Sequence, residues 1–418
     1  KWHLSRTAPR QSEAEQLDWL SHRADFGDFA PRASYPSNRG FDEHWGVIWG
    51  VVNHYDPFSL VHDEEPVREV PPGFYMTDFI THKSVEMIDR FSRADRPFFL
   101  YIAHTAPHWP LHAPEADVTS YRGLYDEGWE ALRLSRYRRQ VAAGLFDGET
   151  TPLPPNSSGE VWGDCRRKAW EAAHMEVHAA MVTRMDQGIG RVVEKLERTG
   201  ELENTLVLFL SDNGASPERG FPPGFDRPGR LRDGTRIRYD DVRPGPADTW
   251  GYLGAAWASA ANTPFRYWKK ESFEGGIRTP AIVHWPRGLL TRGGSVSTAV
   301  AHVMDVMPTL VELAEARHPG ELEGRGVMRP EGMSLVPLLR GRPYAGHETL
   351  YWEHEGGRAV RHGAWKLAAL PEGEWELFDL SVDRTESRDV SARHPRKVAE
   401  LASLWAAWRA RLPRPAER

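Results

Sequence analysis

Hydrophobic residues along the chain alternate between short runs of strand length and longer stretches with helical spacing. The apolar run Pro97–Ala103 is followed by an amphipathic stretch over 181–196 and then by the apolar run Thr205–Leu210. Gly200 stands just after the middle stretch, where a helix would stop. The pattern predicts a strand, a helix on a sheet face and a second strand, which is the βαβ rhythm of an α/β protein.

The second half of the chain continues this pattern and then changes character. A strand is predicted over 281–285, where Pro286 ends it, and a helix over 303–316. Beyond that helix the apolar runs become shorter. We therefore expect a large domain over 1–343 and a small C-terminal α+β domain over 344–418. The strand-like runs of the small domain lie at 349–353, 364–369 and 374–380, and its helix at 396–412.

Two stretches, 113–165 and 214–262, interrupt the rhythm because they are rich in Gly, Pro, Arg and Asp. This composition is typical of long surface insertions near a functional site. We expect irregular backbone in both, and we expect them to carry the features that select a substrate.

The composition is that of a folded enzyme. Of the 418 residues, 40% are hydrophobic and 11% aromatic, and 53 basic residues nearly balance 59 acidic ones. Such a balance gives no global basic field, so we expect no nucleic-acid partner and an anion held only locally. No apolar run reaches the roughly 18 residues that a membrane-spanning helix needs. The single cysteine, Cys165, excludes an internal disulfide, and both the cytoplasm and the periplasm remain open as compartments.

The tetrapeptide Ser211–Gly214 directly follows the strand predicted over 205–210. Asp212 and Asn213 therefore stand at the C-terminal end of a buried strand, where α/β sheets bind their ligands. Their hard oxygens suit Ca²⁺ or Mg²⁺. Because Asp-Asn-Gly also favours a turn, the tetrapeptide alone leaves both a metal site and a plain turn open.

His108 follows the run over 97–103 in the same way, on a loop flanked by prolines. A histidine on a rigid loop can bind an anion or move a proton near neutral pH. His104 and His112 are interpreted as bystanders, because the chain holds 18 histidines.

Two adjacent lysines, Lys269 and Lys270, precede a Glu-Gly-Gly sequence that leads into the strand predicted over 281–285. Glycines permit a tight backbone turn, and lysines can meet an anionic group. On this segment alone, a solvated charge cluster is the simpler interpretation.

Taken in order, these segments and the opening Lys1–Leu4 resemble the type I sulfatases, which include the arylsulfatases, of the alkaline phosphatase-like superfamily. The resemblance implies an α/β fold with a large mixed sheet flanked by helices and a smaller C-terminal antiparallel sheet with a helix. It also implies a sulfuric ester hydrolase acting on a small-molecule or carbohydrate sulfate ester. Further matching segments are Arg39–Gly46, Tyr55–Pro57, Phe74–Asp78, Asp186–Gly190 and Glu376–Leu380.

The resemblance also assigns roles to residues of this chain. Lys1 would contact the sulfate and the nucleophile, and His3 would assist the nucleophile's hydroxyl. His108 and Lys269 would contact the sulfate oxygens and protonate or stabilise the departing alcohol. We expect these residues and the metal ligands to converge at one edge of the main sheet.

For the metal, the resemblance makes Asp212 and Asn213 ligands of a divalent cation, usually Ca²⁺. Two oxygen donors fill only part of the roughly six to eight positions around Ca²⁺. Lys269 is preferred to Lys270 because it occupies the family's position five places before Glu274.

In this family the nucleophile is a formylglycine, which a maturation enzyme makes from Cys or Ser in a Cys/Ser-x-Pro-x-Arg motif upstream of Lys-Trp-His. That motif does not occur in the 418 residues, since Cys165 has other neighbours and Ser34–Arg39 carries its arginine one place late. We therefore expect that the family's N-terminal segment is missing, that the nucleophile lies upstream of Lys1, and that residues 1–418 alone are inactive and poorly stable.

Two other functions remain open. A phosphonate or phosphate ester hydrolase of the same superfamily would bind a tetrahedral oxyanion of similar size. A noncatalytic, anion-binding relic would also lack the nucleophile motif.

Overall fold

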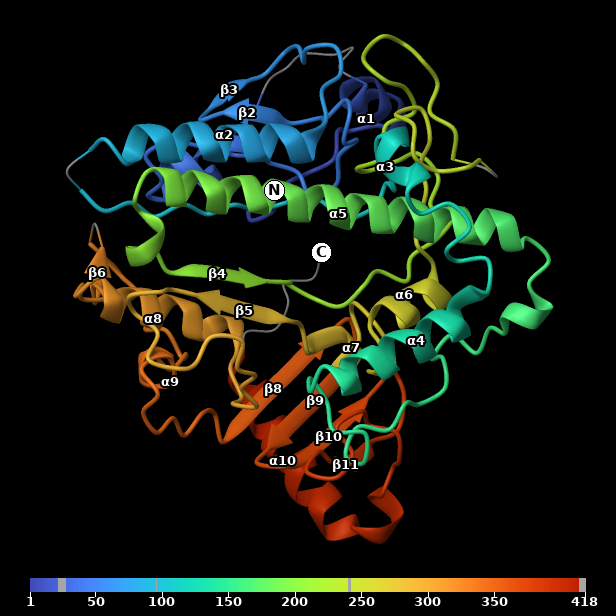
Figure 1. Cartoon of the computed structure of the whole chain (residues 1–418), viewed down its shortest axis with the longest axis vertical. Helices are drawn as coiled ribbons and strands as arrows, with labels where there is room; N and C mark the ends of the chain where they lie inside the picture. The colour runs from blue at the N-terminus through green and yellow to red at the C-terminus, as the bar shows by residue number, and fades with distance from the viewer. Residues whose placement is uncertain (22–27, 95, 240–241, 323, 413–418) are drawn as a thin grey trace. The chain divides into compact units, whose positions relative to one another are not determined.

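The computed structural model describes residues 1–21, 28–94, 96–239, 242–322 and 324–412. These residues form a mixture of helices and strands, which confirms the α/β class (Figure 1). The chain divides into two compact units. Unit one comprises Lys1–Leu132, Glu160–Leu202 and Ser216–Trp257, and unit two comprises Arg133–Gly159, Glu203–Ala215 and Ala258–Arg418.

A pair of long helices dominates unit one, where α5 (Lys168–Arg198) runs alongside α2 (Met76–Phe91) (Figure 1). The helix predicted over 181–196 is thereby confirmed, and it begins earlier than predicted. Its first turns bury Ala173, Val177 and Ala180, whose spacing places them on one helical face. The other elements are α1 (Glu13–Leu20), β1 (Trp45–Val47), β2 (Leu60–His62), β3 (Glu65–Pro66) and α3 (Glu115–Thr119), while α4 (Gly128–Ala142) and α6 (Ala255–Ala261) each contain a boundary between the units.

An aromatic cluster fixes the segment that follows β1. The rings of Trp19 and Phe58 meet edge to face with centroids 4.7 Å apart, and those of Trp19 and Trp49 at 5.5 Å. The indole nitrogen of Trp49 donates a hydrogen bond to the carbonyl oxygen of Phe29 at 2.8 Å. Each such ring pair contributes about 0.5–1.5 kcal/mol beyond its buried area, so the backbone leading to Gly50 is firmly held.

The strand predicted over 97–103 does not form. No ladder in the described part of the chain includes these residues, and the side chains of Phe99 and Tyr101 are 61% and 56% exposed. An apolar pattern supplies only one requirement of a strand, because its N–H and C=O groups also need a neighbouring strand.

The insertion over 113–165 is also more regular than predicted, since it contains α3 and the 15-residue helix α4. Arginine, leucine and alanine are good helix formers, and the arginine-rich composition that favoured a loop is compatible with a helix. The insertion over 214–262 carries no strand of its own among its described residues and ends in α6.

Unit two contains two main sheets, both antiparallel (Figure 1). β4 (Val207–Leu210) pairs with β5 (Ala281–His284), with Leu210 opposite Ala281, so both predicted strands are confirmed. The described strands thus gather in small antiparallel sheets and form no large mixed sheet, because strand pairing depends on partners that local sequence does not specify. Smaller elements of this unit are α7 (Glu274–Ile277), α8 (Val306–Leu313), β6 (Glu321–Leu322), β7 (Arg325–Gly326) and α9 (Val336–Leu339).

The predicted C-terminal sheet and helix are present. The sheet has the order β11-β10-β9-β8, and Leu401 of the helix is buried with Val360, Leu367 and Leu377 of the sheet. The sequence analysis missed β9, whose turn from β8 places Glu355 and Gly356 at the positive φ values of 48° and 89°. The boundary near residue 344 stays a prediction. The elements are β8 (Thr349–His354), β9 (Gly357–His362), β10 (Trp365–Ala369), β11 (Glu376–Asp379) and α10 (Pro395–Arg411).

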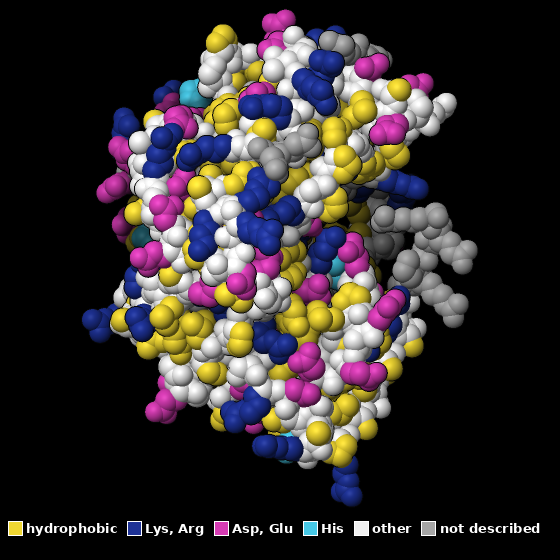
Figure 2. Space-filling model, turned by 90° about the vertical axis from the view of Figure 1, so that its right-hand side faces the viewer, with side chains coloured by type: hydrophobic (Ala, Val, Ile, Leu, Met, Phe, Trp, Pro, Cys, Tyr) yellow, Lys and Arg dark blue, Asp and Glu magenta, His cyan; other side chains and the backbone are white. Residues whose placement is uncertain are grey.

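Charged side chains of both signs are interspersed on the face in Figure 2. An anion on this face would therefore meet local groups of cations and not one continuous basic surface. In the described part of the chain, every helix is too short or too polar to span a membrane.

Candidate functional site

Lys1 and His3 meet at Gly50, just beyond β1. The Nζ atom of Lys1 donates a hydrogen bond to the carbonyl oxygen of Gly50 at 2.9 Å. The ring of His3 occupies the space above Gly50, where a Cβ atom would lie 2.2 Å from Nε2. Between them, the backbone nitrogen of Trp2 donates to the carbonyl oxygen of Val47 at 3.1 Å. Lys1 and His3 thus both lie against Gly50, and a side chain at position 50 would clash with the ring of His3.

His108 has one ring nitrogen committed to the backbone. Its Nδ1 lies 2.7 Å from the carbonyl oxygen of Trp109, and because a carbonyl only accepts, Nδ1 carries the proton. The lone pair of a neutral His108 therefore resides on Nε2, and a protonated ring presents an N–H there. The half-buried side chain can accordingly take up or release a proton at a defined atom.

His54, which the sequence analysis missed, supports the loop that carries His108. The ring is fully buried, and burial, together with the neighbouring His112, lowers the pKa of His54 to about 3. The neutral ring uses Nε2 to donate to the carbonyl oxygen of His108 at 3.3 Å, and Nδ1 accepts from the hydroxyl of Thr105 at 3.4 Å. Lys1 is near enough to lower the pKa of His54 further. The only sequence signal for His54 is its position two residues after the apolar pair Val51–Val52.

The bystander interpretation of His112 fits its contacts. Its Nε2 donates to the carbonyl oxygen of Thr249 at 2.7 Å, and its Nδ1 accepts from the backbone nitrogen of His54 at 3.3 Å. Both ring nitrogens are therefore used inside the protein. Burial lowers the pKa of His104 and of His112 to about 4, which keeps both rings neutral at physiological pH.

In unit two, Asp212 and Asn213 follow β4 as predicted. The backbone nitrogen of Ser211 still pairs with the carbonyl oxygen of Pro280 at 3.3 Å, so the two side chains emerge where the ladder ends. The amide NH₂ of Asn213 donates to the carbonyl oxygen of Gly214 at 2.8 Å. This contact uses the NH₂ group, so the amide oxygen of Asn213 is the atom that a cation could bind, beside the exposed Asp212 carboxylate.

Three glycines allow the Asp212 loop to touch α7 backbone to backbone. The nitrogen of Gly214 donates to the carbonyl oxygen of Gly276 at 3.0 Å. A Cβ atom on Gly214 would lie 1.8 Å from the carbonyl oxygen of Gly275, and one on Gly275 would lie 2.1 Å from that of Arg266. None of the three glycines has a positive φ, so the turn conformation predicted from sequence does not explain them. Glycine is required here because the backbones approach each other too closely for a side chain.

Lys269 is held beside the same loop. Its backbone nitrogen donates to the carbonyl oxygen of Ala215 at 2.9 Å, two residues after Asn213. Lys270 is exposed, and its Nζ pairs with the carboxylate of Glu355 at 3.2 Å. The side chain of Lys270 is thus paired with Glu355, and the choice of Lys269 as the sulfate-binding lysine stays a prediction.

The donor set of unit two fits part of the coordination shell of a hard cation. Asp212 and Asn213 offer oxygen ligands of the kind that Ca²⁺ and Mg²⁺ prefer. Across the described ranges, no group of three or more His, Cys, Asp or Glu side chains could hold a metal ion by itself. A cation bound here would complete its shell with other oxygens.

The six candidate residues fall into two sets. Lys1, His3 and His108 belong to unit one, and Asp212, Asn213 and Lys269 belong to unit two. The structure brings Lys1 and His3 together at Gly50, and it brings the Lys269 backbone to the loop of Asp212 and Asn213. Convergence of the two sets at one sheet edge stays a prediction.

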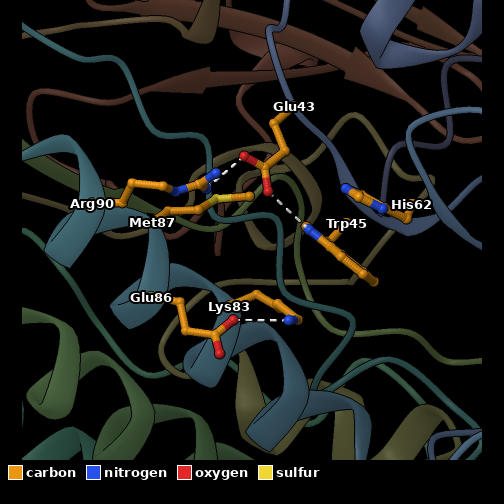
Figure 3. A pocket seen from close by; sticks show the side chains of 7 residues that line it. All are labelled: Glu43, Trp45, His62, Lys83, Glu86, Met87 and Arg90. Carbon is orange, nitrogen blue, oxygen red and sulfur yellow. Dashed lines mark hydrogen bonds and ion pairs between the residues drawn. The ribbon is translucent and has the colours of Figure 1, made fainter.

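A pocket of about 330 Å³ in unit one contains none of these residues (Figure 3). Its cations are already paired with its own carboxylates: Lys83 lies 2.8 Å from Glu86, and Arg90 lies 2.5 Å from Glu43. It therefore offers no uncompensated charge to a sulfate group. The lining residues are Glu43, Trp45, His62, Lys83, Glu86, Met87 and Arg90.

Two protein families match the chain. The family described as "Sulfatase" matches residues 15–316, a range that includes every candidate site residue except Lys1 and His3. The family described as "N-sulphoglucosamine sulphohydrolase, C-terminal" matches residues 265–405.

Individual relatives agree with these matches. An uncharacterised sulfatase of Schizosaccharomyces pombe is 35% identical over 406 residues, which cover 90% of this chain and 72% of the relative. An arylsulfatase of Klebsiella aerogenes is 31% identical over 324 residues, which cover 74% of this chain and 68% of the relative. A protein solved in complex with its substrate D-glucosamine-2-N,6-O-disulfate superposes with a TM-score of 0.56 at 19% identity, over 89% of this chain and 76% of the other, and this likeness shows the fold.

Proposed function

The chain belongs to the sulfatase family, and we propose that it hydrolyses a sulfate ester with the six residues identified above. The observation that carries the proposal is the backbone packing around Gly214, which holds two oxygen ligands and Lys269 on adjoining segments. A sulfate group needs positive charge around its oxygens, and in our proposal Lys269 and a divalent cation on Asp212 and Asn213 would supply it.

Each residue has a proposed role, which the family resemblance supplies and with which its contacts agree. Lys1 and Lys269 would neutralise the sulfate oxygens, because preorganised charge is the largest contribution to many such reactions. His108 would give a proton from Nε2 to the departing alcohol, since its Nδ1 proton is held by Trp109. His3, fixed over Gly50, would move a proton at the nucleophile's hydroxyl.

Two groups from outside the described residues complete the proposal. A divalent cation, Ca²⁺ in our proposal, would be held by Asp212 and Asn213 and would withdraw charge from the sulfate. The formylglycine typical of the family would supply the nucleophile, after conversion by a maturation enzyme.

We propose a carbohydrate sulfate or a small aryl sulfate as the substrate class. The support is the sulfated glucosamine that is the substrate of the structural neighbour, together with the similarity to the arylsulfatase of Klebsiella aerogenes. The insertions over 113–165 and 214–262 are where we expect the choice between them to be made.

The test is hydrolysis of 4-nitrophenyl sulfate with added Ca²⁺, using the whole open reading frame that encodes this chain, produced together with a formylglycine-generating enzyme. We expect turnover that Lys269→Ala lowers strongly and Lys270→Ala leaves nearly unchanged. Equal losses in the two variants would contradict the role of Lys269. Faster hydrolysis of 4-nitrophenyl phosphate or a phosphonate ester would contradict the sulfatase assignment.

A further inference from the structure

A fully buried lysine is linked, through two glutamates, to the segment that carries Lys269. Lys366, the second residue of β10, places its Nζ 2.8 Å from the carboxylate of Glu274 and 2.6 Å from that of Glu386. All three side chains are at least 95% buried. An ion group so deep in a protein is costly to desolvate, and apolar residues of similar volume would often be equally stable. Stability alone therefore does not explain why three ionisable residues are buried together here.

Glu386 contacts both ends of the segment Arg266–Glu274. Its carboxylate accepts a hydrogen bond from the backbone nitrogen of Glu274 at 2.7 Å. Its backbone carbonyl accepts another from the guanidinium of Arg266 at 2.5 Å. Lys269 lies between these two contacts, so one residue from the loop after β11 holds the lysine segment at its beginning and at its end.

The same segment is joined to the Asp212 loop. The nitrogen of Gly275 donates to the carbonyl oxygen of Arg266 at 2.8 Å, and the backbone nitrogen of Lys269 donates to Ala215 at 2.9 Å. Because Gly214 and Gly275 are in van der Waals contact or closer, a shift of Glu274 would displace both Lys269 and the loop of Asp212.

We propose that Glu386 is a positioning residue for Lys269, and that Lys366 holds the Glu386 carboxylate in the place where it can act. The proposal rests on the proposed function, in which Lys269 binds the sulfate oxygens. In this account the C-terminal sheet sets the geometry of the sulfate-binding lysine.

The pKa shifts of Glu386 and Glu274 agree with a role in holding the segment of Lys269. Burial raises the pKa of Glu386 to about 7, against the attraction of Lys366. Burial also acts on Glu274, but the attraction of Lys366 and Arg278 outweighs it and lowers the pKa of Glu274. Glu274 therefore stays ionised and bound to Lys366, while the Glu386 carboxyl keeps its contact with the Glu274 backbone nitrogen.

The first experiment measures hydrogen exchange and does not depend on catalysis. In the purified protein made from the whole open reading frame, Glu386→Gln should speed amide exchange within 263–278 and leave α10 unchanged. Glu400→Gln is the matched control, because Glu400 pairs with Lys397 at 2.7 Å on the surface of α10. Unchanged exchange over 263–278 in Glu386→Gln would overturn the proposal.

The second experiment asks whether Glu386 acts through Lys269. In the active enzyme, Glu386→Gln should raise the KM for 4-nitrophenyl sulfate and the inhibition constant for inorganic sulfate by about tenfold, less than the roughly hundredfold that a 1 Å misplacement can cost. The same change should add almost nothing in a Lys269→Ala background. Equal effects with and without Lys269 would show a structural role only and would overturn the proposal.

A third variant separates stability from positioning. Lys366→Met alone leaves two buried carboxylates without their shared cation and should unfold readily, whereas Lys366→Met with Glu386→Met should recover much of the stability. We expect this double variant to keep the weak sulfate binding, and recovery of full sulfate affinity would overturn the proposal. If the unaltered enzyme neither turns over the ester nor binds sulfate, the proposed function fails, and the exchange measurement still decides whether Glu386 holds the segment of Lys269.

Discussion

Gly214 and Gly275 are in such close backbone contact that a Cβ atom on Gly214 would lie 1.8 Å from the Gly275 carbonyl oxygen. The contact joins the loop of the proposed metal ligands to the turn that follows Lys269. No side chain fits between the two backbones, so this close contact requires glycine at both positions.

Gly214→Ala should therefore destabilise the protein by at least about 1–3 kcal/mol, the usual cost of forcing atoms into a packed region. Urea unfolding measures the loss. Gly293→Ala is the control, because no atom lies within 4 Å of a Cβ there, and its effect should stay within about 0.5 kcal/mol. A Gly214→Ala variant as stable as the control would contradict the contact.

Stability should fall as the pH drops from about 6.5 toward 5, because of buried histidines. Burial lowers the pKa of His54 to about 3, and that of His44, His104, His112 and His174 to about 4. Below the unfolded value of about 6.5, the unfolded chain binds protons that the folded chain does not, so stability is present above that pH and is lost below it.

The measurement is the free energy of unfolding in urea between pH 7 and 5, a range above most carboxylate titrations. His54→Asn should make the decline shallower, whereas His82→Asn should not, since His82 is 69% exposed. An unchanged slope in His54→Asn would show that His54 is not held neutral.

The stability lost in Glu386→Gln should shrink as the pH rises from 5 to 8. Burial raises the folded pKa of Glu386 to about 7, above its unfolded value of about 4.5. Between these values the folded state holds a proton that the unfolded state lacks, so the contribution of Glu386 is greatest at low pH and declines through pH 7.

The charged groups facing Glu386 are Lys366 of β10 and Glu274 of α7, with Arg278 bound to Glu274 at 3.3 Å. Urea unfolding of the variant and the unaltered protein at several pH values gives the difference directly. A difference that grows toward pH 8 would mean that the ionised carboxylate is the stabilising form.

His108→Ala should reduce turnover most for aryl sulfates with basic leaving groups. A proton from Nε2 matters most when the departing oxyanion is a strong base. The measurement is kcat/KM across a series of substituted phenyl sulfates, with Lys269→Ala as a comparison. A uniform loss across the series would make His108 a binding group without a role in proton transfer.

Several elements of the fold were predictable because their signals are local. The helices α5 and α10 and the strands β4 and β5 each carry their own periodicity, and the residues around Asp212 form a short motif that ends a strand. The resemblance of the ordered motifs selects Lys269, because the local sequence alone favours a solvated charge cluster there.

The sequence by itself determined which segments favour helix and strand, and which family the ordered motifs match. Tertiary structure decided that the apolar run over 97–103 stays outside any described ladder, that His54 supports His108, and that Lys366 joins Glu274 to Glu386. Hydrophobic periodicity is a property of neighbouring residues, whereas these contacts join residues far apart in the chain: 92 positions separate Lys366 from Glu274, and 112 separate Glu274 from Glu386. Burial of a charged group becomes favourable only when such distant partners meet, so no local pattern can encode it.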